Sequence, residues 1–309
     1  MTVETAPKRA LGNVISSEQF DRPLLDQIFE RASGLANVRD DRLAHRIMAT
    51  LFYEPSTRTR LSFESAMLRL GGAVLGTEAA HTFSSAIKGE TLEDTIRMVS
   101  TYADVIVLRH DEEGAAARAA AVASVPVVNA GDGPGEHPTQ ALLDLYTIER
   151  ELGHVEGVQI AFCGDLRFGR TARSLALLMA LYPGVGMTFV APDVVQVRRD
   201  ILDRLEAHGI TCRLADQLTD VLDGVDVVYQ TRVQKERFTD PAEYELARSA
   251  IRIDKALMEQ LPPNAIVMHP LPRIDEIAPE VDADPRAAYF RQAANGVAIR
   301  MALLEMLLA

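Results

Sequence analysis

Short apolar runs rich in β-branched residues alternate with helical patterns along most of this chain. Read as strands, the runs cover residues 47–52, 105–108, 125–128, 158–163, 187–190, 225–229 and 265–268. Helices are predicted between them at residues 91–102, 138–152, 171–181, 198–208 and 241–248, with an alanine-rich helix from residue 115. Strands that alternate with helices are typical of parallel sheets, so the pattern predicts an α/β fold.

Two domains fit this pattern. A chain of 309 residues can hold two domains of about 150 residues each, and the glycine-rich and proline-rich residues 129–138 (NAGDGPGEHP) form the best boundary. We expect a first domain over residues 1–137 and a second over 138–292, each a parallel sheet flanked by helices. A final helix within residues 293–309 is expected to pack back on the first domain.

Composition excludes several classes of function. A net charge of −12 and a pI near 5.1 argue against a nucleic-acid-binding or anionic-membrane-binding surface, so any anion site must be a local basic cluster. Residues 1–15 lack the apolar segment of a signal peptide and no long apolar run is present, so we expect a cytoplasmic protein without membrane contact. Cys163 and Cys212 have no CxxC spacing and the histidines form no HExxH motif, so no metal site is predicted.

The stretch YEPSTRTRLSFESAMLRLGG, residues 53–72, predicts a helix with an unusual start near Ser56. Apolar residues recur at the spacing of one buried helical stripe, at Phe63, Ala66, Met67 and Leu70. A helix N-terminus carries about half a positive charge and favours acids, yet Arg58 and Arg60 stand there. An anion held by free N–H groups, hydroxyls and a guanidinium would resolve this conflict. Alternatively, both arginines are solvated or paired with Glu54 and Glu64.

Polar side chains also follow the other predicted strands. They are Arg109 after the second strand, His137 and Gln140 after the third, Arg170 after the fourth, Arg232 and Gln234 after the sixth, and His269 and Arg273 after the last. Ligands of open α/β sheets bind outside the carboxyl ends of the strands. We therefore expect one active site in a cleft that both domains share.

Six motifs together resemble the carbamoyltransferase family, on its aspartate-specific side. They are FYEPSTRTRLSFE, SSAIKGE, HPTQALLDLYTI, GDLRFGRT, TRVQKERF and HPLPR, in the family's order and over nearly the whole chain. The resemblance implies transfer of the carbamoyl group of carbamoyl phosphate to the α-amine of L-aspartate. The products would be N-carbamoyl-L-aspartate and phosphate, a step of pyrimidine biosynthesis, formed by direct attack through a tetrahedral intermediate. It implies no metal or organic cofactor.

The resemblance also assigns roles to residues. Ser56, Thr57, Arg58 and Thr59 would hold the phosphate; Arg109, His137 and Thr59 would contact the carbonyl oxygen; and Gln140 would reach the amino group. Arg170, Arg232 and Gln234 would bind the aspartate carboxylates, with the backbone of Leu271 and Pro272 completing the pocket. Ser84 and Lys88 match a loop that enters the neighbouring subunit's site, which implies a homotrimer. The catalytic set is then Arg58, Thr59, Lys88, Arg109 and His137.

In isolation several of these residues have simpler interpretations. Arg109 could form a surface ion pair with a nearby acid, His137 could be a helix-entry residue, and Lys88 could belong to a solvated loop. His269 is expected to shape its turn, and neither it nor His110 is placed in the catalytic set. A regulatory chain or a dihydroorotase remains possible as a further partner.

Three other functions stay open. Transfer to ornithine would bring a cationic side chain to Arg170 and Arg232, and ornithine enzymes usually carry HCLP where this chain has HPLP at residues 269–272. A dinucleotide-dependent dehydrogenase would need a glycine at the position of Leu166 in GDLRFG. A non-catalytic homologue is expected to have lost STRTR, His137 or Lys88, and all are present.

Overall fold

A computed structural model describes residues 11–78, 89–235 and 238–308. The chain divides into two compact units, one formed by Met1–Thr139 with Val297–Ala309 and the other by Gln140–Gly296. Within the described residues, no helix combines the length and the apolarity needed to cross a bilayer.

The first unit is built on a four-stranded parallel sheet in the order β2-β1-β3-β4. Its strands are β1 (Ile47–Phe52), β2 (Ala73–Glu78), β3 (Val105–His110) and β4 (Val127–Asp132). The inner strands β1 and β3 are buried along nearly their whole length, as expected for strands rich in Ile, Val and Leu that are covered on both faces. The sheet is therefore the core of this unit.

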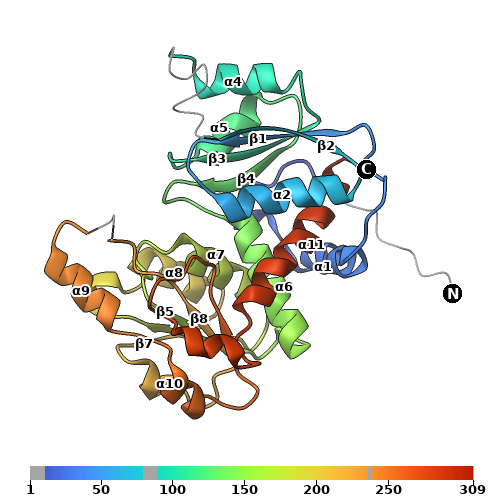
Figure 1. Ribbon diagram of the computed structural model, residues 1–309. Helices are drawn as coiled ribbons and strands as arrows, with labels where there is room; N and C mark the ends of the chain where they lie inside the picture. Colours follow the sequence, from blue (N-terminus) through green and yellow to red (C-terminus); the bar gives the residue numbers. More distant parts are fainter. Residues whose placement is uncertain (1–10, 79–88, 236–237, 309) are drawn as a thin grey trace. The chain divides into compact units, whose positions relative to one another are not determined.

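Helices cover both faces of that sheet (Figure 1). On one face α4 (Leu92–Val99) and α5 (Ala115–Val122) bury Ile96 and Ala119 against Leu51 and Ile106. On the other face lies α2 (Thr57–Arg69), with α1 (Arg22–Leu35) also in this unit. The last turns of α11 (Tyr289–Leu308) belong here too, where the Arg300 guanidinium lies 4.9 Å from the centre of the Phe63 ring.

The second unit holds a five-stranded parallel sheet in the order β7-β6-β5-β8-β9. The strands are β5 (Gln159–Cys163), β6 (Gly186–Val190), β7 (Cys212–Ala215), β8 (Val227–Gln230) and β9 (Ile266–Met268). The helices are α6 (Pro138–Leu152), α7 (Arg170–Met179), α8 (Arg199–Ala207), α9 (Pro241–Ser249) and α10 (Lys255–Gln260). Phe162 packs between Phe189, at 5.3 Å, and Tyr229, at 5.7 Å between ring centres, so aromatic side chains fill the middle of the sheet.

The predicted fold class is confirmed: two parallel sheets flanked by helices. Two strands, β2 and β7, were not predicted. Both lie at a sheet edge, and most of their residues remain partly or fully exposed, so they lack the apolar run that marks an inner strand. The ends of β3 and β4 were also placed too early, because Arg109 lies inside β3 rather than after it.

Candidate active site

Each sheet has a topological switch point, and polar side chains gather beside both. In the first unit β1 is flanked by β2 on one side and β3 on the other, so the ends of β1 and β3 diverge there. In the second unit the corresponding pair is β5 and β8. Ligands bind at such points because loops leave the sheet in opposite directions. Residues 56–59 follow β1, Arg109 is the second-last residue of β3, Arg170 follows β5 and Arg232 follows β8.

The helix α2 begins without a side-chain cap among the described residues. Ser56 is its N-cap residue, and its described first turn holds no acid. The first helical bond is donated by the Arg60 N–H to the Ser56 carbonyl at 3.0 Å, which leaves the N–H groups of residues 57–59 as the unsatisfied donors of a helix start. Partial burial lowers the pKa of Arg58, because the charged guanidinium loses part of its hydration. A nearby anion would offset this loss by stabilising the charged form.

The two arginines in the first turn of α2, Arg58 and Arg60, differ. Arg60 Nε lies 3.8 Å from Glu64 Oε1, so the ion-pair interpretation is correct for Arg60. Glu54 turns to Arg109 instead, at 3.1 Å, and leaves Arg58 as the cation at the helix start. Arg60 is therefore engaged with an acid of its own helix, whereas Glu54 pairs with Arg109 and not with Arg58.

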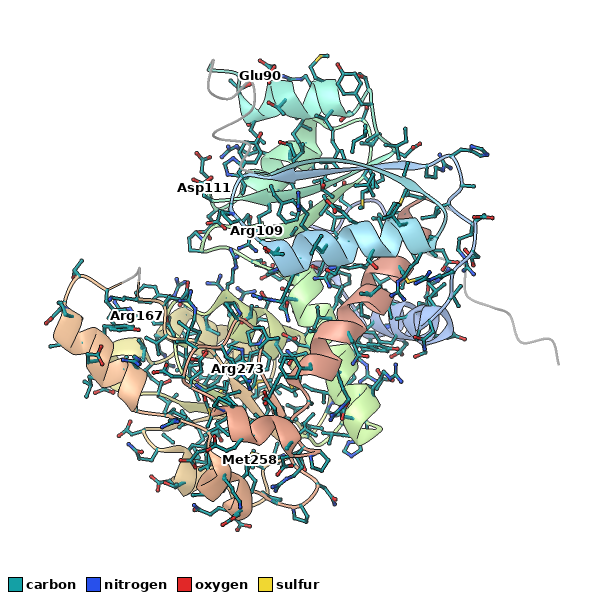
Figure 2. The ribbon with its side chains drawn as sticks, in the orientation of Figure 1. Glu90, Arg109, Asp111, Arg167, Met258 and Arg273 are labelled. Carbon is teal, nitrogen blue, oxygen red and sulfur yellow. The ribbon has the colours of Figure 1, made fainter. Side chains whose placement is uncertain are left out.

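Arg109 is a buried arginine rather than half of a surface ion pair. Its side chain is 13% exposed, and it contacts Glu54 at 3.1 Å and the Ala130 carbonyl through Nη1 at 3.1 Å. Burial lowers the pKa of Arg109, and the Glu54 charge only partly offsets this. Its Nε atom is buried and has no hydrogen-bond partner among the described residues, so a donor remains for a ligand. Figure 2 shows Arg109 at the end of the sheet where α2 begins.

His137 stands between β4 and α6 and is 5% exposed. Its Nδ1 lies 3.5 Å from Thr139 Oγ1. The preceding residue, Glu136, is held by the Ser16 hydroxyl and the Ser17 N–H, each at 2.7 Å, and by the Ser17 hydroxyl. The N-terminal segment thus fixes the chain directly before His137, a contact that sequence reasoning missed.

A buried carboxylate that was not predicted lies one helical turn after Gln140. Asp144 accepts from Gln140 Nε2 at 2.8 Å, from the Tyr229 hydroxyl at 2.6 Å and from Gln292 Nε2 at 2.6 Å. Burial raises the pKa of Tyr229 well above its ordinary value, and the Asp144 charge adds to this, so Tyr229 remains a donor. The i,i+4 spacing in HPTQALLDLY was the available signal.

The second unit places its arginines around the ends of β5 and β8. Arg170 is the first residue of α7, which, like α2, has no side-chain cap among the described residues and no acid in its first turn. Gly164 follows β5 with φ +100°, and a Cβ there would lie 2.3 Å from the Thr231 carbonyl oxygen. Gly169 is equally tight, with a Cβ 2.2 Å from the Asp165 carbonyl oxygen. Gly164 therefore packs against the end of β8 and Gly169 against its own loop. Both close approaches are made to protein atoms, and Leu166 is buried, which argues against the dinucleotide fingerprint.

A small, open hollow adjoins the end of β8. Arg232, Tyr244, Arg248 and Glu276 are among its lining residues. Beside it, the Gln234 N–H donates to Asp165 Oδ2 at 3.4 Å, which connects the loops after β5 and β8. Arg232 thus lies at a concave surface within one unit.

His269 shapes its turn, as predicted. Its Nδ1 accepts from the Leu271 N–H at 2.8 Å, its Nε2 lies 2.8 Å from Glu276 Oε1, and its own N–H donates to Gln292 Oε1 at 2.9 Å. These bonds hold Leu271 at φ +53°, a left-handed backbone that a leucine rarely adopts. The backbone of residues 271 and 272 is therefore rigidly presented.

We expect acid to destabilise the protein through Glu276. Burial by itself raises the pKa of Glu276, but hydrogen bonds from His269 and two backbone N–H groups outweigh it and lower the pKa from 4.5 to about 2. The folded state then gains about 3 kcal/mol above pH 4.5, which is lost as the pH falls from 4.5 towards 2. Glu276→Gln should lower the free energy of unfolding at pH 7 and flatten its pH dependence, as measured by urea denaturation.

The exposed Glu280, four residues on, supplies the control. Glu280→Gln should leave both quantities unchanged. An unaltered acid dependence in Glu276→Gln would contradict the assignment.

The described residues of the predicted site fall into two groups, one in each unit, and their roles stay predictions. Ser56, Thr57, Arg58, Thr59, Arg109 and His137 lie in the first unit, and Gln140, Arg170, Arg232, Gln234, Leu271 and Pro272 in the second. Ser84 and Lys88 lie outside the described residues. The shared cleft stays a prediction. Among the residues that the structure describes, no cluster of three or more His, Cys, Asp or Glu could hold a metal ion.

Curated relatives correct one expectation. The chain is 57% identical to "Aspartate carbamoyltransferase, chloroplastic" of rice, covering 96% of this chain and 85% of that protein. It is 56% identical to a chloroplastic aspartate carbamoyltransferase of pea, covering 97% and 78%. The prediction of a cytoplasmic location is therefore wrong, since these relatives work in a chloroplast. Composition cannot tell these two locations apart, because proteins of the chloroplast stroma and of the cytosol face similar aqueous surroundings.

Solved structures and family models agree with these relatives. The structure of aspartate transcarbamoylase from Trypanosoma cruzi in complex with carbamoyl phosphate and aspartate matches with a TM-score of 0.91 at 45% identity, over 96% of this chain and 97% of that one. Residues 13–150 match the carbamoyl-P binding domain of the aspartate/ornithine carbamoyltransferases, and residues 156–307 match their Asp/Orn binding domain. The chain belongs to the aspartate/ornithine carbamoyltransferase family.

Proposed function

We propose which residues carry the reaction of this chain, the transfer of the carbamoyl group of carbamoyl phosphate to L-aspartate. The products are N-carbamoyl-L-aspartate and phosphate, in pyrimidine biosynthesis. The observation that carries the proposal is the uncapped, acid-free start of α2 with Arg58 beside it. That arrangement fits a phosphate dianion, because free N–H groups, the helix dipole and a guanidinium all favour negative charge.

The first domain, residues 1–137, binds carbamoyl phosphate in this proposal. The N–H groups and hydroxyls of Ser56, Thr57 and Thr59, together with Arg58, hold the phosphate. The buried Nε of Arg109 and the ring of His137 then face the carbonyl oxygen with Thr59. Donors fixed around an oxygen that gains charge are typically the largest catalytic term.

The second domain, residues 138–292, binds L-aspartate. Arg170 and Arg232 each offer a planar fork that suits a carboxylate, and Gln234 adds an amide. The backbone at Leu271 and Pro272 completes this pocket, held in place by His269. Gln140 contacts the carbamoyl amino group.

The reaction then depends more on how the two substrates are positioned than on a dedicated side-chain base. The uncharged α-amine of aspartate attacks the carbamoyl carbon, and a C–N bond forms as charge gathers on the carbonyl oxygen. The tetrahedral intermediate collapses with cleavage of the C–O bond to phosphate, and the departing phosphate accepts the amine proton. Holding two anions in contact overcomes their repulsion, and oriented reactants reach effective molarities of about 10⁵–10⁸ M.

The complete site is assembled in a homotrimer, with Ser84 and Lys88 supplied by a neighbouring subunit. Chains carrying Lys88→Ala and chains carrying Arg58→Ala should each be nearly inactive alone. When the two are mixed, some sites receive Arg58 from one subunit and Lys88 from its neighbour. Random mixing in equal amounts restores about a quarter of wild-type activity in a closed cyclic assembly.

The hybrid measurement has two controls. Each variant taken through dissociation and reassociation alone should stay inactive, and light scattering should report a trimer in every sample. A mixture that stays as inactive as its components would show that each site is complete within one chain.

A further inference from the structure

One carboxylate in the second unit joins three elements. Asp144 is fully buried in α6, and its Oδ1 accepts from both Gln140 Nε2 and Gln292 Nε2, at 2.8 and 2.6 Å. Its Oδ2 accepts from the Tyr229 hydroxyl at 2.6 Å. Tyr229 comes from β8 and Gln292 from α11, so the carboxylate is held from the sheet and from two helices.

A carboxylate accepts hydrogen bonds and donates none, so it decides which end of a neighbouring amide faces it. The NH₂ end of Gln140 must therefore point at Asp144, and its carbonyl oxygen must point away. The same rule orients Gln292, whose NH₂ faces Asp144 while its oxygen accepts from the His269 N–H at 2.9 Å. Two amides thus take their direction from one buried charge.

We propose that Asp144 is a positioning residue that sets the direction of the Gln140 amide and thereby selects a carbamoyl group over an acetyl group. The inference rests on the proposed role of Gln140 at the carbamoyl amino group. With its NH₂ held by Asp144, Gln140 presents an oxygen that accepts from a carbamoyl NH₂ and gains nothing from the methyl of an acetyl group. If the Gln140 amide were reversed, its NH₂ would face the carbamoyl NH₂, and two donors cannot form a hydrogen bond with each other.

Acetyl phosphate is the probe that distinguishes a changed direction of the Gln140 amide from a general loss of activity. It matches carbamoyl phosphate except for a methyl in place of the amino group, and it would transfer its acetyl group to the same amine with release of phosphate. The readout is kcat/KM for carbamoyl phosphate divided by kcat/KM for acetyl phosphate, at saturating L-aspartate. A purely structural loss lowers both terms and leaves the ratio unchanged.

Gln140→Ala should lower this ratio about tenfold, the effect of one lost hydrogen bond to the amino group. Asp144→Ala should lower it by a similar factor, and the double variant no further, because both changes remove the same interaction. Tyr229→Phe is the matched control. It deletes a bond to Oδ2 without touching Oδ1, so its melting temperature should fall while the ratio stays at the wild-type value.

Asp144→Asn tests the idea in a chain that keeps the shape of the site. Its oxygen can accept from both glutamines while its NH₂ donates to the Tyr229 hydroxyl, so the ratio should stay within about twofold of wild type. A tenfold fall in Asp144→Asn would overturn the inference, even where Asp144→Ala does not fold. Additive effects of Gln140→Ala and Asp144→Ala would also overturn it.

The glutamine variant separates this inference from the proposed function. An unchanged ratio in Gln140→Ala would refute the role of Gln140 itself. A lowered ratio in Gln140→Ala with an unchanged ratio in Asp144→Ala would refute only the role of Asp144.

Discussion

Replacing Arg58 with alanine is expected to lower kcat about a thousandfold, the scale of losing one fixed donor to transition-state charge. The negative charge on the phosphate grows as the C–O bond breaks, so the Arg58 guanidinium is worth more in the transition state than in the bound substrate. The remaining N–H groups at the start of α2 should keep weakened phosphate binding, since the helix itself is unchanged. Steady-state kinetics with both substrates, and calorimetric titration with inorganic phosphate, would measure the two effects.

Arg60 offers a control in the same helix. Its guanidinium lies 3.8 Å from Glu64, and we expect Arg60→Ala to change kcat by less than about fivefold, as for a modest ion pair. Equal losses in the two variants would mean that α2 needs positive charge in general rather than a cation at its start.

Inner strands and amphipathic helices carry local signals, and these positions were predicted closely. Residues 47–52 are predicted and observed as one strand, because β1 is covered on both faces and must be apolar throughout. β7 (CRLA) is short and half exposed at the edge of its sheet, so pairing with β6 alone makes it a strand. No local pattern encodes such a contact.

The candidate site divides in the same way. Arg58 was predictable because its charge conflicts with a helix start, and that conflict lies within five residues of sequence. The partner of Arg109 was not, since Glu54 lies 55 positions away and reaches it only because β1 and β3 are neighbours. The role of Asp144 could not be predicted either, because its partners Tyr229 and Gln292 lie 85 and 148 positions away.

Selectivity for aspartate over ornithine should be large, because the side chains of the two substrates carry opposite charges. In the proposed site, aspartate would bring a side-chain carboxylate to Arg170 and Arg232, whereas ornithine would bring an ammonium. A site built to bind one polar group rejects an analogue that lacks it by about 10⁴–10⁵ in kcat/KM. Repulsion between the ammonium and two guanidinium groups acts in the same direction.

The turn at residues 269–272 supports the same preference. His269 is fixed between Glu276 and the Leu271 N–H, so in the proposed site this segment would present a rigid backbone to the ligand. A rigid pocket cannot rearrange to bring a carboxylate towards an ammonium side chain.

The central claim is that fixed cations of both units bring two anionic substrates together. It is tested most directly by measuring carbamoyl transfer from carbamoyl phosphate with L-aspartate and with L-ornithine as acceptors, on the same preparation. We predict a kcat/KM at least about 10⁴-fold higher for L-aspartate. Comparable values for the two amines, or a preference for ornithine, would contradict it.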